Sequence, residues 1–186
     1  MKRNRQTRFL QQIVLASLFA AMTTVLTFYI KIPAHNGYIH LGDSIIYLAA
    51  SFLPTPLAMI CAGLGGMLAD ALGGYTLYML PTFAIKSLLV LPFGRKSNKI
   101  LTKRSLVALP AASLITVAGY YIAEVVIISV SSTNGFGQFC EYFFSSVAWA
   151  SAIYSIPGNI IQAVGSAIIF IMLGAALDKI KIKDKI

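Results

Sequence analysis

Long apolar runs, separated by short polar segments and clusters of positive charge, dominate this sequence of 186 residues. A helix of roughly 20 apolar residues spans the ~30 Å hydrocarbon core of a bilayer, and runs of that length recur along the chain. Only 11% of the residues are charged, whereas a soluble domain carries about 25%. The sequence therefore excludes a soluble globular domain and predicts an integral membrane protein.

Prolines, glycines and polar loops divide the apolar runs into six predicted helices. The second helix is short because Pro54 and Pro56 follow it, and proline breaks a helix by removing a backbone donor. We expect an all-α membrane protein, a single bundle of six transmembrane helices that forms one integral membrane domain over residues 1–186. The predicted spans are residues 9–30, 44–54, 57–72, 77–93, 106–130 and 147–177.

Positive charge gathers at three places between these spans. Of the 15 Lys and Arg residues, 13 lie in segments 2–8, 95–104 and 179–185. Lys and Arg accumulate in the cytoplasmic loops of membrane proteins. We therefore expect both termini in the cytoplasm, loops 31–43, 73–76 and 131–146 outside, contact of the basic clusters with the lipid bilayer, and no nucleic-acid partner.

Two ionisable residues, Lys86 and Glu124, are predicted to lie at membrane depth on the fourth and fifth helices. A charge inside the bilayer costs roughly 2.5–3.5 kcal/mol on insertion scales, so it is seldom kept without a role. Two interpretations stay open: the two side chains pair with each other, or they face a ligand cavity. A third such residue, Asp70, is expected to bond a neighbouring helix or loop.

Polar side chains recur at helical spacing on the last three predicted helices, which favours the cavity. Apolar walls carrying a few placed polar groups are typical of small-molecule sites. We expect this cavity to open toward the outer side. The stripes comprise Tyr78, Thr82 and Lys86 on the fourth helix, Tyr120 and Glu124 on the fifth, and Ser155, Asn159 and Gln162, flanked by Ser151 and Ser166, on the sixth.

The segment before the second helix carries further polar residues. His35, Asn36, Tyr38 and His40 are expected to fold over the cavity as a cap and to contact the ligand. Asp43 is expected at the N-cap of the second helix, where a carboxylate accepts hydrogen bonds from free amides. Contact of Asp43 with the ligand is the alternative.

Small residues at four-residue spacing predict close helix packing, because they let helix backbones approach in lipid. Ala58, Ala62 and Gly66 form such a face on the third helix, where packing inside the bundle explains them. For Ala16 and Ala20 on the first helix, packing inside the bundle and contact with a separate partner protein stay equally open.

Three motifs resemble the substrate-binding S components of energy-coupling factor (ECF) vitamin transporters, in particular the group with riboflavin-, pyridoxine- and hydroxymethylpyrimidine-type members. They are GYIHLGDSIIYLAASFLP, LGGMLADALGGY and PTFAIKSLL, spanning residues 37–89. The resemblance implies a six-helix subunit in the plasma membrane of a prokaryote that captures a micronutrient from outside. It also implies partners: a membrane coupling protein (T component), which would meet the Ala16–Ala20 face, and two ATPase subunits.

The ligand expected from this resemblance is a small, flat, hydroxylated heteroaromatic of the pyridoxine or hydroxymethylpyrimidine kind. A thiamine site built on several tryptophans does not fit, since Trp149 is the single tryptophan. We expect no cofactor and no metal. The alternatives are a stand-alone secondary transporter or channel and, less favoured, a membrane-embedded enzyme; the sequence contains neither GxSxG nor HExxH.

Overall fold

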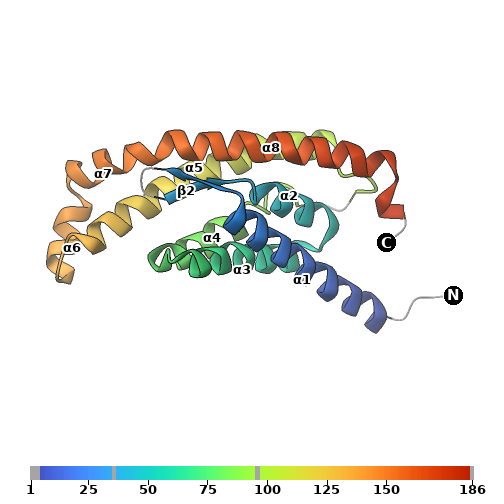
Figure 1. Ribbon diagram of the computed structural model, residues 1–186, viewed down its shortest axis with the longest axis horizontal. Helices are drawn as coiled ribbons and strands as arrows, with labels where there is room; N and C mark the ends of the chain where they lie inside the picture. The colour runs from blue at the N-terminus through green and yellow to red at the C-terminus, as the bar shows by residue number, and fades with distance from the viewer. Residues whose placement is uncertain (1–4, 35–36, 95–96, 185–186) are drawn as a thin grey trace.

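The computed structural model describes residues 5–34, 37–94 and 97–184, and these are almost wholly helical (Figure 1). Helix α8 runs along one side of the molecule with α5 beside it, while α1, α3 and α4 form the opposite side. The start of α1 and the end of α8 lie at the same end, and α6 lies at the other. Which end faces the cytoplasm stays a prediction.

Among the described residues, four helical segments are long and apolar enough to cross a membrane. They are α1 (Arg5–Tyr29), α3 (Thr55–Gly73), α5 (Lys103–Ser131) and the run Ser146–Lys179, which joins α7 (Ser146–Ala152), the 3-10 turn η2 (Ile153–Ser155) and α8 (Ile156–Lys179).

Two of the predicted spans correspond to short helices. Helix α2 (Asp43–Phe52) and helix α4 (Met79–Leu88) each have 10 residues. Within the predicted fourth span, residues 77–93, the 3-10 turn η1 (Thr76–Tyr78) precedes α4 and turns follow it, and the extent of this membrane crossing stays a prediction. The number of membrane crossings, six, stays a prediction.

Two segments predicted as loops contain regular structure. Strands β1 (Lys31–Ala34) and β2 (Gly37–His40) pair antiparallel, a small addition to the mostly helical fold that the sequence did not predict. The segment 131–146 contains α6 (Phe136–Phe143). A short 3-10 turn, η3 (Ile182–Asp184), follows α8.

Local sequence explains where these helices begin and end. Pro54 is the N-cap of α3, with Pro56 in its first turn, where a missing N–H costs no helical bond. Gly74, at φ +81°, ends α3 in the left-handed conformation that glycine adopts without steric penalty. Thr102 and Ser105 form a reciprocal capping box at the start of α5.

Helix α3 lies between α1 and α4, and glycines allow both contacts. A Cβ added at Gly66 would lie 2.8 Å from the Lys86 Cγ atom of α4, and one added at Gly65 would lie 2.9 Å from the Ala20 carbonyl oxygen of α1. Ala58 and Ala62 are fully buried. The small-residue face of α3 therefore packs inside the bundle, as predicted.

The same contact bears on the two interpretations of the first helix. Ala16 is only 5% exposed, and Ala20 packs against the apolar core beside α3. Packing within the chain thus accounts for Ala16, whereas Ala20 is only partly buried; contact of the Ala16–Ala20 face with a partner protein stays a prediction. Large apolar side chains on the other faces of α1, such as Val14, point outward instead.

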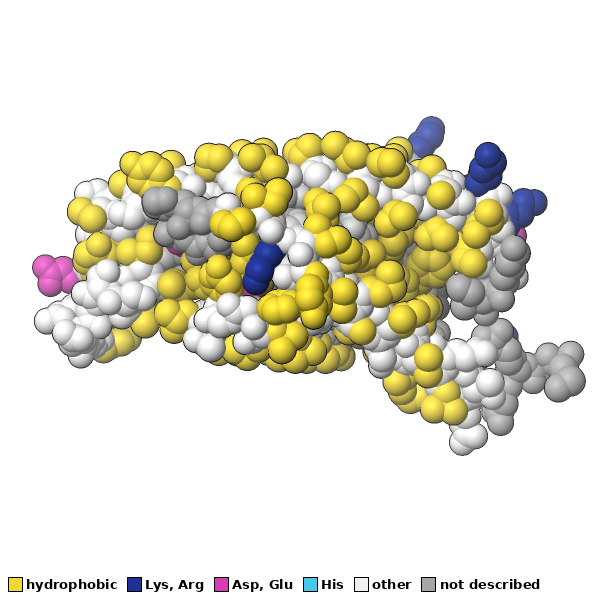
Figure 2. Space-filling model, in the orientation of Figure 1, with side chains coloured by type: hydrophobic (Ala, Val, Ile, Leu, Met, Phe, Trp, Pro, Cys, Tyr) yellow, Lys and Arg dark blue, Asp and Glu magenta, His cyan; other side chains and the backbone are white. Residues whose placement is uncertain are grey.

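The outer surface is dominated by hydrophobic side chains. Figure 2 shows them over the middle of the molecule, with Lys and Arg gathered at the end where α8 finishes. A soluble monomer rarely exposes contiguous apolar patches larger than a few hundred Å². This surface is suited to contact with lipid acyl chains, with the basic end at a headgroup region.

Candidate functional site

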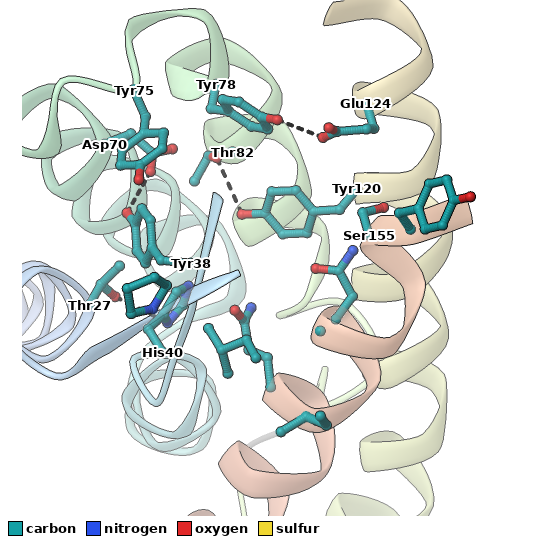
Figure 3. A pocket seen from close by; sticks show the side chains of 17 residues that line it. Thr27, Tyr38, His40, Asp70, Tyr75, Tyr78, Thr82, Tyr120, Glu124 and Ser155 are labelled. Atoms are coloured by element: carbon teal, nitrogen blue, oxygen red, sulfur yellow. Dashed lines mark hydrogen bonds between the residues drawn. The ribbon is translucent and has the colours of Figure 1, made fainter. Parts of the chain in front are cut away.

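A half-open cavity of about 240 Å³ lies where the β-hairpin meets the ends of α3, α4, α5 and α8 (Figure 3). Tyrosine rings and polar side chains make up much of its wall. The lining residues are Thr27, Pro33, Tyr38, Ile39, His40, Asp70, Tyr75, Tyr78, Thr82, Tyr120, Glu124, Tyr154, Ser155, Gly158, Asn159, Ile161 and Gln162.

The three polar stripes predicted from helical spacing converge on this cavity. Members from each stripe line it, together with two residues of the predicted cap. They are Tyr78 and Thr82, Tyr120 and Glu124, Ser155, Asn159 and Gln162, and from the hairpin Tyr38 and His40. His35 and Asn36, also predicted as cap residues, lie outside the described residues. Contact of any of these side chains with a ligand stays a prediction.

Lys86 does not pair with Glu124, and it does not line the cavity. Its Nζ atom lies 2.7 Å from Asp43 Oδ1, and the two side chains are 1% and 0% exposed. Lys86 occupies the last turn of α4, and its Nζ atom meets Asp43 at the start of α2 while lying 5.0 Å from the centre of the Tyr120 ring of α5. The predicted Lys86–Glu124 pair is therefore wrong, and the prediction that Lys86 faces a cavity is not supported.

Asp43 is not the N-cap of α2 either. Gly42 holds that position without a side-chain cap, while the Asp43 carboxylate accepts from Lys86 through Oδ1 and from Gln162 Nε2 through Oδ2, at 3.0 Å. A buried charge is tolerated only when it is paired and hydrogen-bonded. Pairing with Lys86 therefore takes precedence over capping, and it places Asp43 beneath Gln162 rather than in the cavity wall.

Two carboxylates remain at the cavity, each held by a tyrosine. Glu124 Oε2 accepts a hydrogen bond of 2.6 Å from Tyr78, and Asp70 Oδ1 accepts one of 2.6 Å from Tyr38 (Figure 3). The expected bond between Asp70 and a neighbouring loop is thus confirmed. Asp70 also lines the cavity, which the sequence interpretation missed.

His40 lies on β2 and lines the cavity, and its imidazole ring is neutral. Its Nδ1 atom accepts a hydrogen bond of 3.1 Å from the Gly42 amide, which requires that this nitrogen carry no proton. Burial, followed by the nearby Lys86 charge, lowers the His40 pKa to about 3. His40 therefore presents an Nε2–H group at neutral pH.

Sequence reasoning also missed an aromatic cluster at the cavity. The Tyr75 ring lies 4.9 Å from that of Tyr38 and 6.2 Å from that of Tyr78, between centroids. Tyr75 lies three residues before Tyr78, directly after the Gly73–Gly74 turn, and this spacing was the available signal. Thr27 had a weaker signal, a four-residue step from Thr23 on α1, where both are buried.

The described part of the chain holds no group of three His, Cys, Asp or Glu side chains that could bind a metal ion. What the cavity offers is aromatic surface and hydrogen-bonding groups, mostly acceptors. Such a site is suited to non-covalent binding of a small, flat, polar molecule.

Comparison with known proteins gives a family match and a structural match that agree. A family model described as "ECF-type riboflavin transporter, S component" matches residues 9–179. A solved chain described as "Structure and mechanism of the S component of a bacterial ECF transporter" superposes with a TM-score of 0.68 at 21% sequence identity, covering 92% of this chain and 98% of that chain. This likeness shows the fold. No curated protein matches the sequence.

Proposed function

Because the chain belongs to the ECF-type riboflavin transporter S component family, we propose that it is the substrate-binding subunit of an ATP-driven vitamin importer and that the cavity described above is its substrate site. The observation that carries this proposal is the convergence of polar side chains from α4, α5 and α8 on one cavity in an otherwise apolar bundle. Polar groups at membrane depth are costly, and they mark substrate pathways in membrane proteins.

The first candidate ligand is riboflavin, since the family model names a riboflavin-type transporter. A flavin ring system is flat and would stack against a tyrosine face of the cavity wall, such as that of Tyr38 or Tyr120, and its ribityl hydroxyls would meet the polar groups. The half-open form of the cavity leaves room for part of a ligand to extend beyond the enclosed volume.

A single-ring vitamin of the pyridoxine or hydroxymethylpyrimidine kind is the second candidate. The enclosed volume of about 240 Å³ favours it, because cavities for drug-sized ligands range from roughly 300 to 1,000 Å³. Both candidates share the features that the cavity matches: a flat heteroaromatic ring and hydroxyl groups.

The importer would need further subunits. The sequence contains no GxxxxGK[ST] phosphate-binding loop, so ATP hydrolysis would come from two cytoplasmic ATPase subunits. A membrane coupling protein would link them to this chain. We place the chain in a prokaryotic plasma membrane with both termini in the cytoplasm, where the basic end of the molecule would meet anionic headgroups.

Ligand-dependent thermal stabilisation of the purified protein tests the proposal. Riboflavin, pyridoxine and hydroxymethylpyrimidine are screened separately, and a ligand at 100 times its dissociation constant should stabilise the fold by ~2.7 kcal/mol. Asn159→Leu, at the cavity wall, should abolish the effect. Ser151→Ala, on α7 outside the lining, is the matched control. Absence of stabilisation by all three compounds and other B vitamins would refute the proposed function.

A further inference from the structure

Helix α6 (Phe136–Phe143) lies at the end of the molecule opposite the basic end, between the end of α5 and the start of α7 (Figure 1). Helix α5 begins at Lys103, within the middle basic cluster, and its 29 residues extend over roughly 44 Å at the rise of an α-helix. A bilayer with its headgroup regions is about 40–45 Å thick. A helix that starts in one headgroup region therefore ends in the other, and α6 follows α5 at that depth.

The sequence of α6 separates apolar from polar side chains. Phe136, Phe139 and Phe143 lie three or four residues apart, so they share one face of the helix. Their rings form a row in which consecutive centroids are 6.4 and 5.8 Å apart. Gln138 and Glu141 are exposed on the opposite face. The helix therefore has one side suited to hydrocarbon and one side suited to water.

The end of the phenylalanine row rests on α7, whereas its beginning does not. The Phe143 ring lies 5.8 Å from that of Trp149, between centroids, and Trp149 Nε1 donates a hydrogen bond of 2.8 Å to the Phe143 carbonyl oxygen. Phe136, at the start of the row, is 82% exposed, and Phe144, directly after the helix, is 80% exposed. Exposed apolar patches mark surfaces that contact a membrane or another protein.

Charge and continuity identify the occupant of this surface as lipid. Residues 131–146 contain a single charged side chain, Glu141, so the segment has no cation that could attract an anionic partner. Along α7, η2 and α8 the exposed apolar side chains continue with Val147, Ile153 and Val164, each more than half exposed. They belong to the outer surface that is suited to acyl chains. An amphipathic helix with aromatic residues at headgroup depth is typical of the membrane interface.

We propose that α6 is an interfacial helix, which lies in the headgroup–acyl boundary at the end of the molecule opposite the basic end and inserts the rings of Phe136 and Phe144 among the acyl chains. Gln138 and Glu141 then face headgroups and water. The inference goes beyond the proposed function, but it bears on where the cavity lies in the bilayer. The turn η2 follows α7, and its residue Ser155 lines the cavity, so this side of the cavity is held at the same boundary.

Tryptophan fluorescence in lipid bilayers tests the inference, because Trp149 is the single tryptophan of the chain. In a Trp149→Phe background, Phe136→Trp places a reporter on the apolar face, and Gln138→Trp is the matched control on the opposite face. Each variant is reconstituted in phosphatidylcholine that carries bromine, a fluorescence quencher, either near the headgroup or near the end of the acyl chain.

The two reporters should differ in both emission and quenching. The apolar face of an interfacial helix lies ~5–10 Å into the headgroup–acyl boundary, so bromine near the headgroup should quench the Phe136→Trp reporter about twice as strongly as bromine near the chain end. The Gln138→Trp reporter should emit at longer wavelength, as in water, and should be quenched little by either lipid. Replacing part of the phosphatidylcholine with anionic phosphatidylglycerol should leave the quenching unchanged, because the contact is apolar.

Several results would overturn the inference. Water-like emission without quenching at position 136 would show that the row faces solvent, and equal quenching at positions 136 and 138 would show that the whole helix is immersed. Stronger quenching by the deep bromine would place α6 in the hydrocarbon core. Emission at short wavelength without quenching would show that a protein, either a second copy or a partner, covers the row instead of lipid.

The design separates this inference from folding and from the substrate site. If Trp149→Phe fails to fold, both reporters are placed in the wild-type chain, the Trp149 fluorescence is subtracted, and the expected results stay the same. Because the measurement needs no vitamin, its failure would leave the proposed function standing.

Discussion

The buried ion pair between Lys86 and Asp43 gives a prediction that the structure makes quantitative. Lys86→Met keeps most of the side-chain volume but removes the cation, so Asp43, which is 0% exposed, is left buried with Gln162 as its remaining side-chain partner. Breaking a buried pair by removing one partner costs about 3–5 kcal/mol. For a chain of 150–250 residues, 1 kcal/mol lowers the melting temperature by about 2–4 °C, so the expected loss is about 6–20 °C.

The partner variant makes this prediction specific. Asp43→Asn retains the shape and an acceptor for Gln162 and should remove much of the penalty when combined with Lys86→Met. The double variant should therefore be more stable than Lys86→Met alone, with a coupling free energy of the order of 3 kcal/mol. The measurement is thermal or denaturant unfolding in detergent micelles, with Lys31→Met, an exposed cation, as the near-neutral control.

The reasoning would be refuted by either of two results. One is a loss below about 1 kcal/mol for Lys86→Met, a value typical of exposed ion pairs. The other is a double variant that is no more stable than the single one, which would mean that the charges are not coupled. Ligand affinity should fall in Lys86→Met as well, because Asp43 would no longer be fixed beneath the Gln162 amide.

Three further predictions concern single positions. Because burial lowers the His40 pKa from about 6.5 to about 3, the unfolded state binds the extra proton, and stability should fall by up to ~1.4 kcal/mol per pH unit from about pH 6.5 toward 3. His40→Asn, which keeps an acceptor, should remove that share of the pH dependence in unfolding experiments. Gly66→Ala, whose new Cβ would meet two α4 side chains at 2.8 Å, should cost ~1–3 kcal/mol, whereas Gly137→Ala, with nothing within 4 Å, should leave the melting temperature unchanged. Ala16→Trp should abolish ligand binding and lower the yield of folded protein, since the Ala16 side chain is buried. Val14→Trp, at a position 69% exposed, should leave binding intact. Intact binding in Ala16→Trp together with lost binding in Val14→Trp would contradict the packing of α1 described above.

The sequence could predict much of the polar lining of the cavity because helical periodicity fixes which side chains share a face. Tyr78 and Thr82, or Asn159 and Gln162, must lie on one side of their helix whatever the bundle does. Polar side chains that face lipid cost free energy. The polar faces of these helices are therefore expected to point into the bundle, toward one another.

The partner of Lys86 could not be predicted, because it depends on how far each helix extends and how the helices are offset. The sequence analysis placed Lys86 at membrane depth within a predicted span of residues 77–93, whereas α4 ends at Leu88. The β-hairpin at residues 31–40 also lacked a sequence signal: its strands have four residues each and include Pro33, which is unfavourable in a strand.

The floor of the cavity bears on whether this chain could transport a ligand alone. Beneath Gln162 lies the Lys86–Asp43 pair, and the core cluster that extends away from it contains the rings of Tyr47, Phe93 and Phe170, with centroids 5.1–5.8 Å apart. These rings fill the space below the ion pair with apolar surface.

A channel or a stand-alone transporter needs a continuous hydrophilic path in at least one of its states. With an ion pair and packed aromatic rings in its way, the ligand should not cross through this chain unaided. In proteoliposomes that contain only this protein, radiolabelled ligand should bind but should not accumulate in the lumen. Phe170→Ala tests the cause: it opens a void in the core, and it should reduce stability by ~3–5 kcal/mol without producing flux. Accumulation by the wild-type chain alone would show that a path opens through the bundle, and the need for coupling and ATPase subunits would then fall away.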